Sequence, residues 1–167
     1  MNIFRRIKMM TTIMEDTYDE LDRVSFPTSN ALMFKRVEEK KDIVKFAMLY
    51  YKSKISKDFF HNPTIFSQSP LYVLQLFKEE LAEKGMDYEK DIPSPEIVDT
   101  EAAYWLGYLI AYWYIVEKYD FEKLSEEDCQ WLFDNYDSLH TQSCEYVYNL
   151  YRDERVLGKE ESGKGNK

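Results

Sequence analysis

The feature that most constrains the fold is a run of 15 residues from 102 to 116, AAYWLGYLIAYWYIV, which holds no charged side chain. Two rows of large side chains repeat every four residues along it: Tyr104, Tyr108 and Tyr112, then Trp105, Leu109 and Trp113. This spacing is that of a helix, and the rows cover more than half of its circumference. We predict a central helix at about residues 99–119 that other helices cover, with Gly107 marking a close approach.

Composition supports an all-α protein. Aromatic residues make up 16% of the chain, whereas five Gly and five Pro leave few turns. Long helices therefore fit better than a turn-rich sandwich. We predict a compact bundle of five or six helices. The apolar run is shorter than the roughly 18 residues that span a bilayer, so we expect no membrane segment.

Other elements follow from periodicity and capping residues. An amphipathic stripe predicts a helix over residues 34–55, preceded by a loop at residues 26–29 and followed by a break at residues 56–69. Caps predict a start at Ser69, a start at Ser125 and, for the central helix, a start at Thr100 or Ser94. A last helix over residues 142–156 is expected to present Tyr146 and Leu150, with Val147 and Tyr151 as further candidates.

The two prolines in residues 91–95 (DIPSP) mark the one candidate boundary. We predict an N-terminal helical region at residues 1–95, with its first 30 residues poorly ordered. A C-terminal helical module follows at residues 96–156. The tail, residues 157–167, is rich in Gly, Lys and Glu and is expected to be disordered.

Charge divides the chain unequally. The formal net charge is −9, yet residues 1–60 carry 12 basic and 9 acidic side chains, against 10 and 22 in residues 61–167. An acidic chain repels phosphate backbones, so nucleic-acid binding is expected only through the N-terminal part. That alternative requires one face to gather these side chains: Arg5, Arg6, Lys8, Lys35, Arg36, Lys40, Lys41 and Lys45.

No catalytic or metal-binding motif stands out, and we expect neither enzymatic activity nor a cofactor. Cys129 and Cys144 have no CxxC spacing and fit buried thiols in a reducing cytoplasm. His61 fits a turn. Asp137, Ser138 and His140 are the residue types of a hydrolytic triad, but residues so close in sequence usually bond the local backbone.

A cluster of carboxylates lies at residues 126–137. Its members are Glu126, Glu127, Asp128, Asp134 and Asp137. Acidic side chains in the first turn of a helix interact favourably with the helix dipole. This favours the interpretation that the cluster is a solvated face that caps the helix. The alternative is an acidic surface that binds a partner.

Two segments together resemble a known group of proteins. They are AYWLGYL at residues 103–109, with Tyr112 and Trp113, and YDSLHTQ at residues 136–142, ahead of residues 145–147. In this order they resemble small helical bacterial proteins encoded in toxin/antitoxin-like gene clusters of Firmicutes and their phages. The resemblance covers residues 100–152. It implies an antitoxin or accessory protein that binds a protein partner, and it implies no chemistry.

We therefore predict a non-enzymatic, antitoxin-like interaction module that uses an acidic, aromatic-rich C-terminal surface. The predicted partner-binding residues are Tyr104, Tyr108, Tyr112, Asp137 and His140. Alternatives are a phage-type inhibitor that mimics DNA, or a regulator that binds nucleic acid through its N-terminal part. A homodimer also remains open.

Overall fold

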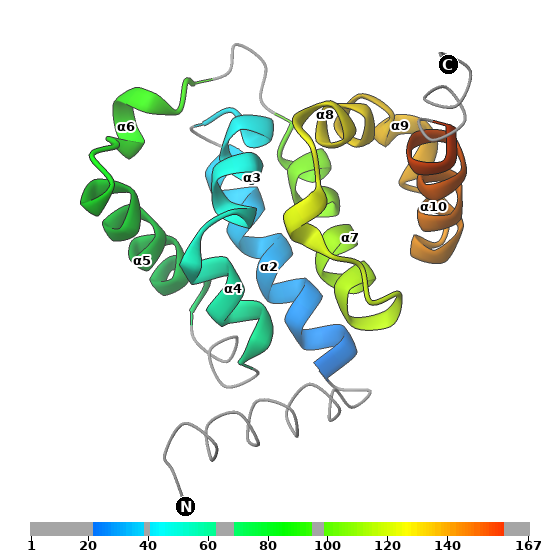
Figure 1. Cartoon of the computed structure of the whole chain (residues 1–167), viewed down its shortest axis with the longest axis horizontal. Helices are drawn as coiled ribbons and strands as arrows, with labels where there is room; N and C mark the ends of the chain where they lie inside the picture. The colour runs from blue at the N-terminus through cyan, green and yellow to red at the C-terminus, as the bar shows by residue number, and fades with distance from the viewer. Residues whose placement is uncertain (1–21, 39–40, 63–68, 95–98, 159–167) are drawn as a thin grey trace, which may run out of the picture.

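The computed structural model describes residues 22–38, 41–62, 69–94 and 99–158, and every regular element among them is helical (Figure 1). This confirms the all-α class, although the described residues form nine α-helices instead of five or six. They are α2 (Asp22–Glu38), α3 (Ile43–Tyr51), α4 (Lys54–His61), α5 (Pro70–Glu83), α6 (Tyr88–Asp91), α7 (Thr100–Val116), α8 (Glu126–Asp134), α9 (Tyr136–Leu139) and α10 (Cys144–Tyr151). A 3-10 turn, η2 (Phe121–Lys123), precedes α8, and a π-helical segment, η3 (Arg152–Leu157), continues α10.

The central helix is α7, as predicted. Helix α2 runs antiparallel beside it, while α8 and α10 pack against its other sides (Figure 1). The pair α2 and α7 is the most extensively packed pair of described helices. A Cβ at Gly107 would lie 2.8 Å from Cγ of the Phe34 ring, closer than real Cβ atoms come to a neighbour. The close approach predicted at Gly107 is therefore confirmed.

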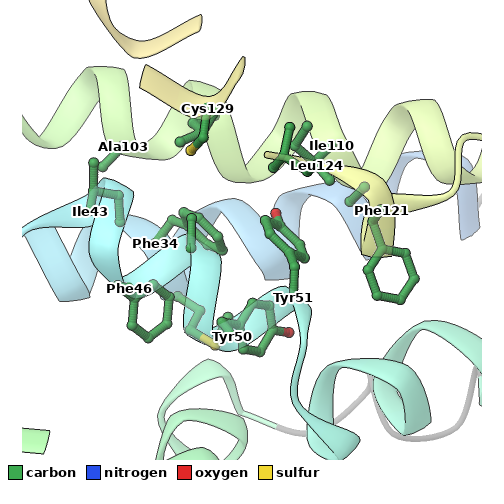
Figure 2. Packing of buried hydrophobic residues seen from close by; sticks show 14 of the residues in the cluster. Phe34, Ile43, Phe46, Tyr50, Tyr51, Ala103, Ile110, Phe121, Leu124 and Cys129 are labelled. Atoms are coloured by element: carbon green, nitrogen blue, oxygen red, sulfur yellow. The ribbon is translucent and has the colours of Figure 1, made fainter. Parts of the chain in front are cut away.

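A polar side chain lies inside this helix pair. Asn30 is fully buried. Its Nδ2 donates to the Gly107 carbonyl at 2.7 Å and to the Tyr51 hydroxyl at 3.2 Å, while its Oδ1 accepts from the Tyr50 hydroxyl at 3.3 Å. Figure 2 shows both tyrosines in the aromatic core, with Phe34 next to them. Asn30 thus joins α2, α3 and α7 through groups that would otherwise lack partners in the core.

The loop predicted at residues 26–29 is wrong, because α2 continues through Pro27. Proline has no N–H to donate to the preceding turn, which usually ends or bends a helix. Here packing offsets that cost, since Phe26 and Phe34 are fully buried and the Phe26 ring lies 4.9 Å from that of Phe60. The polar Asn30 sits in the same buried stripe and hides the helical period from sequence inspection.

The helix predicted over residues 34–55 is also wrong, because the chain divides there. Helix α2 ends at Glu38, and α3 begins after Asp42, whose carboxylate accepts the Lys45 N–H at 3.0 Å. Helix α4 then occupies half of the segment where a break was expected. Phe60 on α4 is fully buried, with its ring 4.3 Å from that of Phe121, so tertiary packing stabilises a helix of only eight residues.

Caps define the C-terminal helices. Ser69 and Ser125 cap α5 and α8 as predicted, but α7 begins after Asp99, which accepts the Ala102 N–H at 3.0 Å, and not after Thr100 or Ser94. The last helix begins after Ser143 and buries two of its four candidate side chains. Its buried side chains are Val147 and Tyr151, whereas Leu150 is half-buried and Tyr146 is 51% exposed.

The division at residues 91–95 stays a prediction. Expectations about residues 1–21 and 159–167 fall outside the described residues. None of the helices in the described part of the chain combines the length and apolar character needed to cross a lipid bilayer.

Candidate functional site

The predicted tyrosine row runs along α7. Tyr104, Tyr108 and Tyr112 are each half-buried. The rings of Tyr108 and Tyr112 stack, with centroids 6.2 Å apart and 17° between their planes. Partial burial raises the pKa of Tyr108 above its ordinary value. The row thus offers aromatic ring surface of the kind that anchors protein interfaces.

A second aromatic group joins α7 to α9. The rings of Trp105 and Tyr136 meet edge to face at 5.7 Å, and the Tyr136 ring stacks on His140 at 4.5 Å with 26° between the planes. We call Trp105, Tyr136 and His140 the aromatic stack. His140 is exposed and the other two are half-buried, so the aromatic stack reaches the surface. Helix α9 follows α8 near the first turns of α7 (Figure 1).

Carboxylates surround the aromatic stack. Burial, and then the nearby negative charges of Asp99, Glu101 and Asp137, raise the pKa of Tyr136. Asp137 is exposed and has no ion-pair partner within the described ranges, whereas Glu101 Oε1 accepts from Lys35 Nζ at 2.8 Å. The surface thus combines aromatic rings with negative charge, a chemistry that attracts the cationic side chains of a partner.

The geometry does not assemble a triad from residues 137–140. The Ser138 hydroxyl donates to the Asn135 carbonyl at 3.1 Å. His140 Nδ1 lies 2.9 Å from the Tyr136 carbonyl, which can only accept, so this nitrogen carries the proton. Both side chains bond the backbone of their own turn, as the sequence interpretation expected. This bond also holds the imidazole in its stack with Tyr136.

The acidic cluster divides between surface and interior. Glu126, Glu127 and Asp134 are exposed and line a shallow hollow of about 910 Å³ beside the half-buried Trp131. Asp128 does not belong to this face, because it is only 5% exposed. The outer face of α8 therefore extends the acidic surface next to the aromatic stack.

The remaining candidate residues have structural environments. The His61 ring meets Tyr114, whose hydroxyl lies 2.9 Å from Nδ1. Cys129 is buried and Cys144 half-buried, and both are free thiols. Burial raises the thiol pKa to about 12 for Cys129 and to about 11 for Cys144, which disfavours the nucleophilic thiolate. In the described part of the chain, no group of three or more His, Cys, Asp or Glu side chains could hold a metal ion.

The basic N-terminal residues are only partly described. Arg5, Arg6, Lys8 and Lys40 lie outside the described residues. Lys41 is 4% exposed, with its Nζ 2.8 Å from the Glu89 carbonyl, and Lys35 pairs with Glu101. Neither lysine therefore offers a free charge to a phosphate backbone. Arg36 and Lys45 are exposed.

Sequence reasoning named five residues of this surface but missed Trp105 and Tyr136 as site members. The spacing of Tyr136 and His140, one helical turn apart, was the signal that could have found the stacked pair. The contact between Trp105 and Tyr136 joins residues 31 positions apart, and no local pattern reveals it.

Comparisons with protein-family models, with curated proteins and with solved structures each found no match. The resemblance of residues 100–152 to proteins of toxin/antitoxin-like clusters stays a prediction. The function is therefore argued from the surface chemistry described above.

Proposed function

We propose that this chain is a non-enzymatic protein-interaction module of antitoxin type, which neutralises or regulates a cognate protein in the reducing cytoplasm of a bacterium or phage-infected cell. The observation that carries the proposal is the aromatic stack, which reaches the surface at His140 beside the carboxylates of Asp99, Glu101 and Asp137. We infer that a basic surface of the partner docks here and covers the aromatic rings.

Two physical effects favour binding at this surface. Opposite charge speeds encounter, and the outer face of α8 adds Glu126, Glu127 and Asp134 to the negative field. Affinity then comes from desolvated rings, because aromatic anchors supply most of the binding energy in typical interfaces. An Arg or Lys of the partner placed over Tyr136 or Trp105 would be attracted by the nearby carboxylates and would also contact the aromatic ring.

The test is recovery of the partner and loss of binding in a surface variant. The tagged full-length chain is used to capture proteins from its native host, followed by mass spectrometry and by light scattering of the recovered complex. We expect one stoichiometric partner whose expression alone is toxic. Its affinity for the variant Asp137→Asn/His140→Ala should fall by at least about tenfold, as for hot-spot residues.

The matched control is Asp58→Asn/Tyr72→Ala, which changes an exposed acid on α4 and an exposed tyrosine on α5. Equal affinity of the site variant, the control and the unchanged chain would reject the assigned surface. Recovery of a DNA-binding enzyme would favour the DNA-mimic alternative, and recovery of nucleic acid would favour the N-terminal alternative. Recovery of nothing beyond a homodimer would reject the antitoxin role.

A further inference from the structure

A separate hollow of about 650 Å³ lies at the other end of α7. It opens between the turn that follows α7, the buried Asp128 of α8, and η3. This volume falls within the range of about 300–1,000 Å³ that small-molecule sites occupy. One wall is the π-helical segment η3, and π-helical turns occur often at functional sites.

The hollow is locally basic although its module is acidic. Four basic and two acidic side chains line it. Both acids are already engaged: Asp128 accepts from Arg155 Nε at 2.9 Å and from the Tyr151 hydroxyl at 3.2 Å, and Asp120 caps the Glu122 N–H at 3.1 Å. The uncompensated charge in the hollow is therefore positive, which favours an anionic ligand.

Two lysines supply that charge. Lys118 and Lys123 are exposed at the hollow and have no acidic partner in the part of the chain that the structure describes. Lys118 adopts a φ of 56°, and no other described non-glycine residue has a positive φ. Glycine is favoured in this conformation, so a lysine here carries a cost in stability.

Aromatic rings also line the hollow. Tyr119 and Tyr148 are half-buried, and both meet the fully buried Trp113, at ring-centroid distances of 5.6 Å and 5.3 Å. Trp113 is itself held by its Nε1, which donates to the Cys144 carbonyl at 2.9 Å. The hollow therefore offers rigid ring surface on which a planar group can pack.

We propose that this hollow binds a nucleoside phosphate. The phosphate lies between Lys118 and Lys123, and the base packs against Tyr148 and Tyr119. Arg155 stays bonded to Asp128 and keeps η3 in place next to α8. The site is distinct from the aromatic stack, so it does not depend on the proposed function.

The experiment is calorimetric titration of the full chain with the four ribonucleoside 5′-monophosphates, inorganic phosphate and adenosine. We expect saturable one-to-one binding of at least one nucleotide, tighter than that of phosphate or adenosine, and weaker at higher salt. The variant Lys118→Gly/Lys123→Gln should bind that nucleotide at least about tenfold more weakly. Its fold should be retained, because glycine suits the backbone at residue 118. The control Lys52→Gln changes an exposed lysine that caps the C-terminal end of α3. It should bind the nucleotide with the same affinity as the unchanged chain.

Three results would overturn the proposal. The first is no saturable binding of any of the four nucleotides. The second is equal affinity of the double variant and the Lys52→Gln control. The third is a nucleotide that binds no tighter than inorganic phosphate, which would remove the role of the rings.

Discussion

The side-chain amide of Asn30 donates to the backbone carbonyl of Gly107 at 2.7 Å, joining two helices 77 residues apart in sequence. The same side-chain amide also donates to the Tyr51 hydroxyl and accepts from the Tyr50 hydroxyl. One polar residue therefore sets the register of α2 on α7 and orients two core rings of α3.

Replacing Asn30 should destabilise the protein strongly. In Asn30→Leu the two tyrosine hydroxyls lose a buried partner, and each unsatisfied group costs about 1–3 kcal/mol. We expect the free energy of unfolding to fall by about 2–4 kcal/mol, measured by urea denaturation. Asn149→Leu, at an exposed position of α10, is the control and should change it by less than about 0.5 kcal/mol. A value for Asn30→Leu within that control range would show that the network contributes little.

A single methyl group at residue 107 should disturb the helix pair. In Gly107→Ala the new Cβ would lie 2.8 Å from Cγ and 2.9 Å from Cβ of Phe34, and these atoms are at the base of the side chain, where they cannot rotate away. We expect a loss of about 1–3 kcal/mol by urea denaturation, the usual cost of overpacking. Combining it with Phe34→Leu should cost less than the sum of the two single changes, because the smaller side chain relieves the clash. Additive losses would contradict the contact.

Lys118→Gly should stabilise the protein. The residue at this position has a φ of 56°, where a side chain is strained and glycine is not. We expect the free energy of unfolding to rise by about 0.5–1 kcal/mol. Lys123→Gly, at a residue of η2 with ordinary backbone geometry, is the comparison and should not raise stability. A loss of stability in Lys118→Gly would mean that the lysine side chain makes a stabilising contact.

Stability should fall as pH rises above about 9. Burial raises the pKa of the Cys129 thiol from 9.0 to about 12. Below pH 9 the folded and unfolded states both keep this proton. Between pH 9 and 12 the unfolded chain loses it while the folded chain retains it, so unfolding is favoured, on the order of 1 kcal/mol by pH 10.

Urea denaturation at pH 7, 9 and 10 measures this dependence. Buried tyrosines add to it, because burial also raises the pKa of Tyr50 and Tyr51. Cys129→Ala should therefore lose stability less steeply with pH than the unchanged chain, whatever its stability at pH 7. Identical slopes for the two proteins would show that the thiol is not the group that titrates.

The sequence by itself determined the helical class, the central place of α7 and the starts at Ser69 and Ser125. These features depend on local patterns: four-residue repeats of large side chains, and hydroxyl caps that satisfy the first free N–H groups. Gly107 could also be interpreted correctly, because a residue without a side chain on an otherwise bulky helix indicates close packing. The shared row of Tyr104, Tyr108 and Tyr112 followed from the same spacing, but only the structure decided how far each ring is buried.

Only the tertiary structure decided the features that depend on contacts distant in sequence. Helix α2 passes through Pro27, and the short helix α4 forms where a break was expected, because both bury phenylalanine rings in one shared aromatic core. The aromatic stack joins Trp105 to Tyr136, and the basic hollow joins the turn after α7 to η3. Local propensity specifies helices, but the free energy of burying side chains from separate helices selects where they begin and which charges they bring together.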